Sequence, residues 1–135
     1  MFEKITEQPS LYDRLEEKST REILEDINRE DRKVAEAVSR TIPMIERLVE
    51  QIVPRMEQGG RLFYMGAGTS GRLGVLDASE IPPTFGMPSK FVIGLIAGGD
   101  RALRNPVEKA EDNTERGWEE LLSHGVNSSD TVIGI

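Results

Sequence analysis

The first half of the chain carries apolar residues at helical spacing. Residues 1–18 are polar and of mixed charge, and we expect them to form an N-terminal arm. Beyond them, apolar residues recur every three or four positions, as on one face of a helix: Val34, Val38, Ile42, Ile45, Leu48, Val49, Ile52, Val53 and Met56. Gly59 and Gly60 end the pattern. We therefore expect residues 19–58 to form a helical layer that buries one face.

Capping and breaking residues subdivide this layer. Ser19 and Glu22 fit a capping box, in which the two side chains pair reciprocally with free backbone N–H groups at a helix start. Asp31 predicts the cap of a second helix. Pro43 and Pro54 predict kinks or divisions further along, because proline lacks the N–H that a helix interior needs.

The second half has the pattern of a buried parallel sheet. Three short, nearly continuous apolar runs are too brief for helices and match strands covered on both faces: residues 62–65, 91–96 and 131–135. A helix separates the last two runs. Asn105 predicts its cap, Pro106 its first position and Gly125 its end. Its shared face consists of Val107, Ala110, Thr114, Trp118, Leu121 and Leu122.

This alternation of strands and helices predicts an α/β protein, with N-terminal helices packed on a doubly wound parallel sheet. We divide the chain into an arm at 1–18, the helical layer at 19–58 and the sheet-containing part at 59–135. A sheet of three strands is small for this architecture, and the chain ends within the third strand. We therefore expect a fragment of a longer protein, truncated after that strand.

Composition and charge exclude several functions. With 17 basic and 24 acidic residues the net charge is −7, and nucleic-acid binding would require a basic face. The lack of cysteine and the single histidine, His124, exclude a disulfide framework and a thiolate or multi-histidine metal site. No apolar stretch approaches a membrane span, and the first ten residues lack the apolar core of a signal peptide. We expect a cytoplasmic protein with neither nucleic acid nor membrane as partner.

A glycine-rich loop follows the first strand. Gly66, Gly68 and Gly71 fit the pattern G-x-G-x-x-G at a strand-to-helix turn, where free N–H groups can bind an anion. Thr69 and Ser70 add hydroxyls that suit a sugar or a phosphomonoester. We expect these five residues to bind substrate. A tight structural turn is the alternative explanation of the glycines.

The same stretch carries a family resemblance. Residues 65–86, MGAGTSGRLGVLDASEIPPTFG, closely resemble the signature of the N-acetylmuramic acid 6-phosphate etherases. Further matching blocks are Ile27-Asn28-x-Glu30-Asp31, Val34-x-x-Ala37-Val38, Ile96-Ala97-Gly98-Gly99 and Glu108-Lys109-Ala110-Glu111-Asp112. The resemblance covers nearly the whole chain and about the first half of a typical family member. It implies a sugar isomerase (SIS) domain, which has a flavodoxin-like fold.

The resemblance also implies a lyase of cell-wall sugar recycling. The family cleaves the D-lactyl ether of N-acetylmuramic acid 6-phosphate and yields N-acetylglucosamine 6-phosphate and D-lactate. Elimination and then hydration can be carried out by two carboxyl groups, so no metal or cofactor is expected. Family members place the active site between subunits, which implies a homodimer that binds a phosphorylated amino sugar.

Glu80 and Glu111 correspond to the two catalytic positions of the family, and which is the acid and which the base stays open. Pro82 predicts that the helix begun near Ser70 ends at Glu80, where the negative end of the helix dipole disfavours a charged carboxylate. Without the resemblance, an exposed loop glutamate would be the better explanation of Glu80. Asp77, three residues earlier, shares its helical face.

Glu108, in the same block of the sequence, is the other candidate for the second catalytic position. Glu108 lies three residues after Asn105, so a capping box explains it, whereas Glu111 lies too deep in the helix to cap. A solvated helix face is the alternative explanation of Glu111.

A second function fits the same resemblance. The glucokinase regulatory protein, which the chain resembles more distantly, uses SIS domains to bind phosphosugars without catalysis. Retention of both carboxylates favours the enzyme, whereas truncation favours an inactive fragment or a binding module for the 135-residue chain alone.

Overall fold

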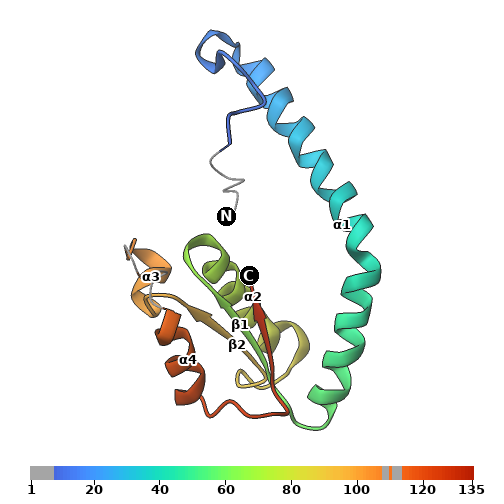
Figure 1. The fold of residues 1–135 in the computed structure, drawn as a ribbon, viewed down its shortest axis with the longest axis vertical. Coiled ribbons are helices and arrows are strands. Elements are labelled where there is room, and N and C mark those ends of the chain that lie inside the picture. The colour runs from blue at the N-terminus through green and yellow to red at the C-terminus, as the bar shows by residue number, and fades with distance from the viewer. Residues whose placement is uncertain (1–7, 108–109, 111–113) are drawn as a thin grey trace. The chain divides into compact units, whose positions relative to one another are not determined.

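The computed structural model describes residues 8–107, 110 and 114–135. The chain divides into two compact units, Met1–Glu46 and Arg47–Ile135. In the first unit the short 3-10 helix η2 (Leu15–Glu17) precedes the start of helix α1 (Thr20–Glu57), drawn in blue in Figure 1. The boundary between the units falls inside α1, and the sheet belongs to the second unit.

The capping box predicted at the start of α1 is confirmed. The Ser19 backbone N–H donates to the Glu22 carboxylate at 2.8 Å, and the Glu22 N–H donates to the Ser19 hydroxyl at 3.3 Å. The predicted division at Asp31, Pro43 and Pro54 is wrong, because α1 runs unbroken through all three. Each proline removes one hydrogen bond from a long helix, which can bend a helix without ending it.

Most of the apolar stripe of α1 is exposed, which contradicts the expected buried face. Only Ile52 is buried, and Met56 packs beside it in the core of the second unit. The exposed members keep 45 to 62% of their accessible surface: Val34, Val38, Ile42, Ile45, Leu48, Val49 and Val53. The last turns of α1 therefore pack into the core of the second unit through Ile52 and Met56, whereas most of the apolar stripe is exposed to solvent.

Three parallel strands form the sheet, as the apolar runs predicted. β1 (Leu62–Gly66) lies in the centre, between β2 (Val92–Ile96) and β3 (Thr131–Gly134). The order β2-β1-β3 means that the chain passes from one side of β1 to the other after β2, which is the doubly wound topology. The predicted fold class is confirmed.

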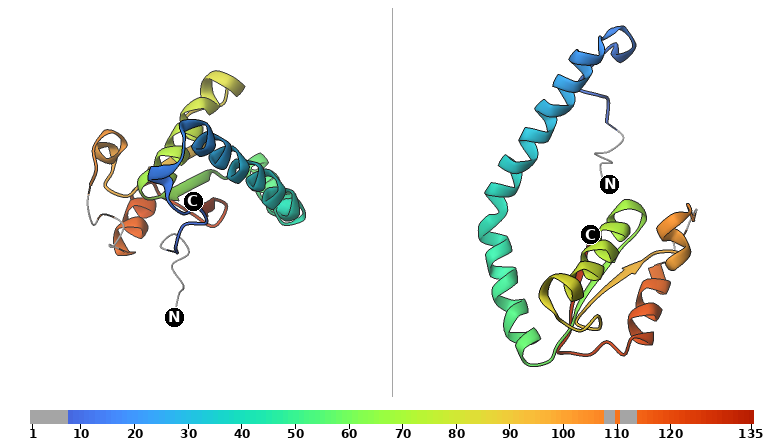
Figure 2. Two further views of the ribbon diagram at one scale, coloured as in Figure 1. Left: turned by 90° about the horizontal axis from the view of Figure 1, so that it is seen from above. Right: turned by 180° about the vertical axis from the view of Figure 1, so that it is seen from behind.

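One face of the sheet is covered by α2 (Gly68–Phe85) and by the end of α1, around Leu62 and Val92 (Figure 2). α2 packs closely because Gly94 of β2 lacks a side chain. A Cβ at Gly94 would lie 2.5 Å from the Cα atom of Val75, which is far below a normal contact.

The other face is covered by α4 (Thr114–Ser123), whose Leu121 packs against Phe63. Phe63 is fully buried, and its register pairs it with Ile93 of β2 and Val132 of β3. The alternation of side chains along β1 thus supplies both cores of the second unit.

The helix predicted from Asn105 begins later than expected. The short helix α3 (Asp100–Arg104) follows β2, and Asn105 is its C-cap, not the N-cap of the next helix. Asn105 has extended backbone angles, as a residue before proline prefers. Pro106 and Val107 lie outside any helix, and the described helix begins at Thr114.

The expected buried face of that helix is also narrower. Trp118 and Leu122 are 56% and 53% exposed, and among the side chains of α4 that the structure describes only Leu121 is buried. The predicted end of the helix is confirmed, because Gly125 adopts a φ of +62° just beyond it. His124 is exposed at that end, as expected.

Candidate functional site

The predicted glycine loop forms a strand-to-helix turn at the carboxyl end of β1. β1 ends at Gly66 and α2 begins at Gly68, whose φ of +54° favours glycine. Ala67 at the N-cap provides no side-chain cap, so the first N–H groups of α2 are left for another acceptor. Thr69 and Ser70 lie in this first turn, and no residue in the described ranges hydrogen-bonds their hydroxyls. The turn can donate to an anion or a sugar.

Packing accounts for two of the three loop glycines. A Cβ at Gly71 would lie 2.6 Å from the carbonyl oxygen of Gly66 and 2.6 Å from Cγ1 of Ile96. A Cβ at Gly66 would lie 2.7 Å from the backbone nitrogen of Gly71. Gly68 differs, because nothing lies within 4 Å of the position of its missing Cβ. The loop therefore combines a tightly packed turn at Gly66 and Gly71 with open space beside the backbone of Gly68.

A cavity of about 230 Å³ lies at the carboxyl ends of β1 and β2, where open parallel sheets bind ligands. β1 contributes Met65 and Gly66 to its wall, and α4 contributes Arg116, Gly117 and Glu120. Sequence reasoning did not single out Arg116 or Glu120. Both are charged residues outside any motif, so no sequence signal pointed to them.

Glu80 projects from the exposed side of α2. The prediction that the helix ends at this residue is wrong, because α2 continues through Pro82 and Pro83 to Phe85. Its carboxylate is exposed and pairs with no side chain in the described part of the protein. Glu80 is therefore in the helix interior, and the helix dipole does not explain a role as an acid.

Glu80 and the glycine loop lie on the same stripe of α2. Thr69, Leu73, Leu76 and Glu80 follow each other at helical spacing, and all four are exposed. At a rise of 1.5 Å per residue, the Cα atoms of Thr69 and Glu80 are about 16 Å apart along the axis. The two predicted site regions are thus well separated on one helix.

Other acidic residues of the predicted site take different positions. Asp77 lies beside Tyr64 of β1, where burial raises the pKa of the Tyr64 hydroxyl and a hydrogen bond to Asp77 raises it further. Glu111, the second predicted catalytic residue, and its competitor Glu108 lie outside the described residues.

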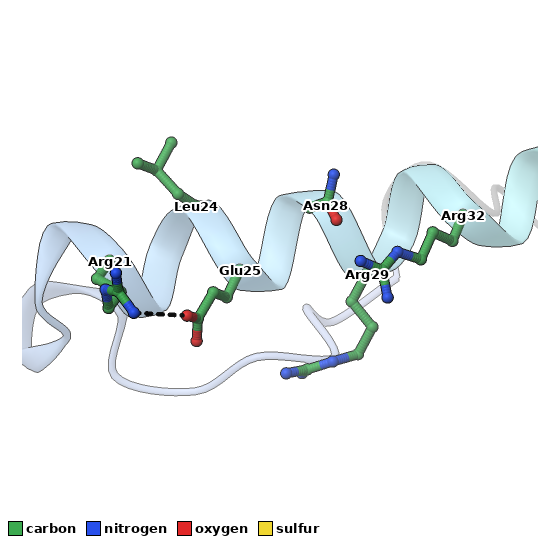
Figure 3. Close-up of a pocket in the computed structure, with 6 residues that line it drawn as sticks. All are labelled: Arg21, Leu24, Glu25, Asn28, Arg29 and Arg32. Atoms are coloured by element: carbon green, nitrogen blue, oxygen red, sulfur yellow. Dashed lines mark ion pairs between the residues drawn. The ribbon is translucent and has the colours of Figure 1, made fainter.

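A second, shallow cavity lies along α1 in the first unit (Figure 3). Its lining comes from one flank of that helix: Arg21, Leu24, Glu25, Asn28, Arg29 and Arg32. Arg21 pairs with Glu25 at 3.6 Å, and both side chains are solvent-exposed. Such a pair contributes little to stability. The sequence did not single out this flank, and we assign it no ligand because only one helix forms its wall.

The described ranges contain neither a candidate metal centre nor a candidate membrane span. The described histidine, aspartate and glutamate side chains include no group of three that could hold a metal ion. None of the described helices is long and apolar enough to cross a membrane.

An open parallel sheet with helices on both faces, and a glycine turn at its carboxyl edge, define an α/β protein of the doubly wound class. The family model of the glucokinase regulatory protein N-terminal SIS domain matches residues 44–135. The chain belongs to this SIS family, as the resemblance implied.

Curated proteins named N-acetylmuramic acid 6-phosphate etherase are similar over the whole chain. The protein from Porphyromonas gingivalis is 98% identical over 135 residues, which are 100% of this chain and 49% of that protein. The protein from Bacteroides fragilis is 78% identical over 134 residues, 99% of this chain and 48% of its own length. The protein from Christiangramia forsetii is 58% identical over 130 residues, which are 96% of this chain and 47% of that protein. The chain spans about half the length of these relatives.

Proposed function

We propose that the full-length protein is a cytoplasmic lyase of cell-wall sugar recycling that cleaves the D-lactyl ether of N-acetylmuramic acid 6-phosphate. The observation that carries this proposal is the 98% identity, along the whole chain, with a protein of that name. The geometry is compatible with it. Free N–H groups and hydroxyls at the start of α2 suit a sugar phosphate, and the exposed Glu80 carboxylate suits proton transfer.

The proposed reaction is an elimination followed by hydration. In the open-chain sugar the aldehyde acidifies the hydrogen on C2, which a base removes. The C3–O bond breaks as an acid protonates the ether oxygen, and D-lactate leaves. Water then adds its hydroxyl to C3 and a proton returns to C2. Glu80 and Glu111 are the proposed pair, and a positioned acid or base is worth on the order of 100- to 10,000-fold in rate.

The length of α2 supports a site shared by two subunits. A phosphate on the first-turn N–H groups lies about 3 Å ahead of Thr69, so it is about 20 Å from the Cα atom of Glu80. The Glu80 side chain and one hydrogen bond span about 8 Å of this distance. A substrate bound to both groups of one subunit would have to span the remaining distance of about 12 Å. Six bonds of about 1.5 Å join phosphorus to the oxygen on C3, so a substrate supplies at most about 9 Å.

We therefore propose a homodimer in which Glu80 acts on a substrate held by the loop of a second copy. The exposed stripe of α1 is the proposed contact surface, because burying apolar surface stabilises by roughly 25 cal/mol per Å². In this proposal residues 1–18 form the arm, 19–58 the helical layer and 59–135 the first part of the SIS domain.

The deciding experiment measures D-lactate released by the full-length protein. N-acetylmuramic acid 6-phosphate should be cleaved, and the same sugar without phosphate should not. Equal release from both sugars would contradict the proposal that the glycine loop recognises the phosphate. No release from either sugar, with the protein folded, would contradict the enzyme.

A non-catalytic phosphosugar-binding module is the second candidate. The observation that favours it is the matching family model, which describes a domain of a regulatory protein. Saturable binding of N-acetylglucosamine 6-phosphate by the full-length protein, without lactate release, would favour the module over the enzyme.

A further inference from the structure

The cavity at the carboxyl ends of β1 and β2 contains a carboxylate that the proposed reaction does not use. Glu120 of α4 is half-buried and lines this cavity, whose volume is about 230 Å³. Its backbone carbonyl accepts hydrogen bonds from the Ser123 hydroxyl at 2.7 Å and from the His124 N–H at 3.2 Å. Its carboxylate has no hydrogen-bond or ion-pair partner among the residues that the structure describes. Because polar groups that are not exposed normally have a protein partner, this carboxylate is a candidate ligand-binding group.

The rest of the cavity wall suits a small ring with polar edges. Met65, Leu95 and Ile96, at the ends of the two strands, give it an apolar side. Arg116 lies one turn before Glu120 on the same face of α4, and these two are the charged residues of the described lining. Their charges balance, which favours a neutral group over a second anion. Cavities for drug-sized ligands measure about 300 to 1,000 Å³, so this smaller one suits a single sugar ring.

The cavity adjoins the glycine loop. Gly66 and Ala67 line it, and Ala67 is the N-cap of α2, whose first N–H groups suit a phosphate. On the opposite wall α4 lies close to β1, because a Cβ at Gly117 would be 2.9 Å from Cε of Met65. A phosphate ester bound at the start of α2 therefore has its sugar next to the space between β1 and α4.

We propose that the Glu120 carboxylate binds hydroxyl groups of a sugar whose phosphate is bound at the start of α2. This inference rests on the proposed function and assigns the sugar hydroxyls to the α4 side of the cavity. A carboxylate accepts hydrogen bonds and donates none, so it selects O–H groups and disfavours an anion. Arg116 has several N–H donors, so it can donate to a sugar oxygen in addition to any other acceptor. The C–H face of the ring packs on the apolar side, at Met65 and Leu95.

Calorimetric titration of the full-length protein compares two phosphomonoesters of the same charge. N-acetylglucosamine 6-phosphate carries hydroxyls, whereas ethyl phosphate carries none, and the wild type should bind the sugar phosphate more tightly. Glu120→Gln keeps the size of the side chain and removes its charge. It should weaken the binding of the sugar phosphate about three- to tenfold, the difference between a charged and a neutral acceptor. Ethyl phosphate should bind equally well or more tightly, because a nearby negative charge is lost.

Glu119→Gln is the matched control. Glu119 is the preceding residue, is exposed and is not among the described residues that line the cavity. Its replacement removes the same charge from the same helix, so it should shift both affinities in the same direction and keep their ratio. Glu120→Ala removes the acceptor altogether and should weaken sugar phosphate binding further. Alanine is the best helix former, so this variant provides a second measurement if the glutamine variant folds poorly.

Three results would overturn the subsite. A folded Glu120→Gln protein with the wild-type ratio of the two affinities would show that the carboxylate does not bind the sugar. Equal losses for both ligands would assign the effect to the loop, and the same change of ratio in Glu119→Gln would assign it to the charge of α4. If the wild type releases D-lactate and only these variants disagree, the proposed function survives. A wild type that neither cleaves the ether nor binds either phosphomonoester would remove both proposals.

Discussion

Replacing Asp130 with asparagine should destabilise the second unit strongly, because this carboxylate joins three parts of it. The Asp130 side chain is 1% exposed and accepts bonds from the Arg61 guanidinium at 2.7 and 3.1 Å and from the Arg61 backbone N–H at 2.8 Å. Arg61 in turn donates to the carbonyls of His124 and Gly125 beyond α4. The starts of β1 and β3 and the end of α4 are therefore joined through one ion pair.

The size of the effect follows from burial. Removing one partner of a buried pair leaves the other charge without compensation and costs about 3 to 5 kcal/mol. Arg61 keeps 23% of its side-chain exposure, so we expect the lower end, about 3 kcal/mol, for Asp130→Asn. Glu25→Gln is the matched control. It breaks an exposed pair with Arg21 and should change the free energy of unfolding by less than about 1 kcal/mol.

Urea unfolding followed by circular dichroism measures both variants, and pH provides a second check. Hydrogen bonds from Arg61 hold the pKa of Asp130 below its usual value near 3.9. The carboxylate therefore stabilises the fold fully above that value, and the stabilisation is lost as pH falls through the lower folded pKa. The difference between wild type and Asp130→Asn should shrink between pH 5 and pH 2. A difference below about 1 kcal/mol at pH 7, or one that does not change with pH, would refute this reasoning.

Three further predictions concern the site, the packing and the assembly. Glu80→Gln and Glu111→Gln in the full-length protein should fold normally and release D-lactate at least about 100-fold more slowly, and near wild-type release would remove that residue from the mechanism. Gly94→Ala should lower stability by about 1 to 3 kcal/mol in urea unfolding, because its Cβ would meet Val75 at 2.5 Å. Gly134→Ala, with no atom near its Cβ, is the control and should change little. If the full-length protein is the proposed dimer, Ile42→Asp should convert it to monomer in light scattering, and an unchanged mass would exclude this stripe as the contact surface.

The strands were predictable because both faces of the sheet are covered. Burial on two sides requires nearly continuous apolar runs, and glycines mark their ends. The turn at Gly66 and Gly68 was predictable from a local signal too, because glycines spaced as G-x-G-x-x-G directly after a strand mark a strand-to-helix turn.

The errors arose where a local signal had more than one structural use. Asn105 and Pro106 look like a helix start, but here the proline forces its predecessor to extend and so ends α3. Pro82 and Pro83 look like a stop, but the packing of α2 on the sheet carries the helix past them. The stripe on α1 was visible, but a periodic pattern identifies an apolar face without saying what covers it.

The central position of β1 has a consequence for the order of folding. β1 is the first strand to be synthesised, and both of its neighbours come later in the chain. Arg61 and its partner Asp130 are separated by 69 residues, which a ribosome adds in about 3 to 14 s at 5 to 20 residues per second. During that interval the edge of β1 that later pairs with β3 stays open, and pairing with β3 must close a long loop. That edge of β1 is therefore open to pairing with a wrong strand until β3 has been made.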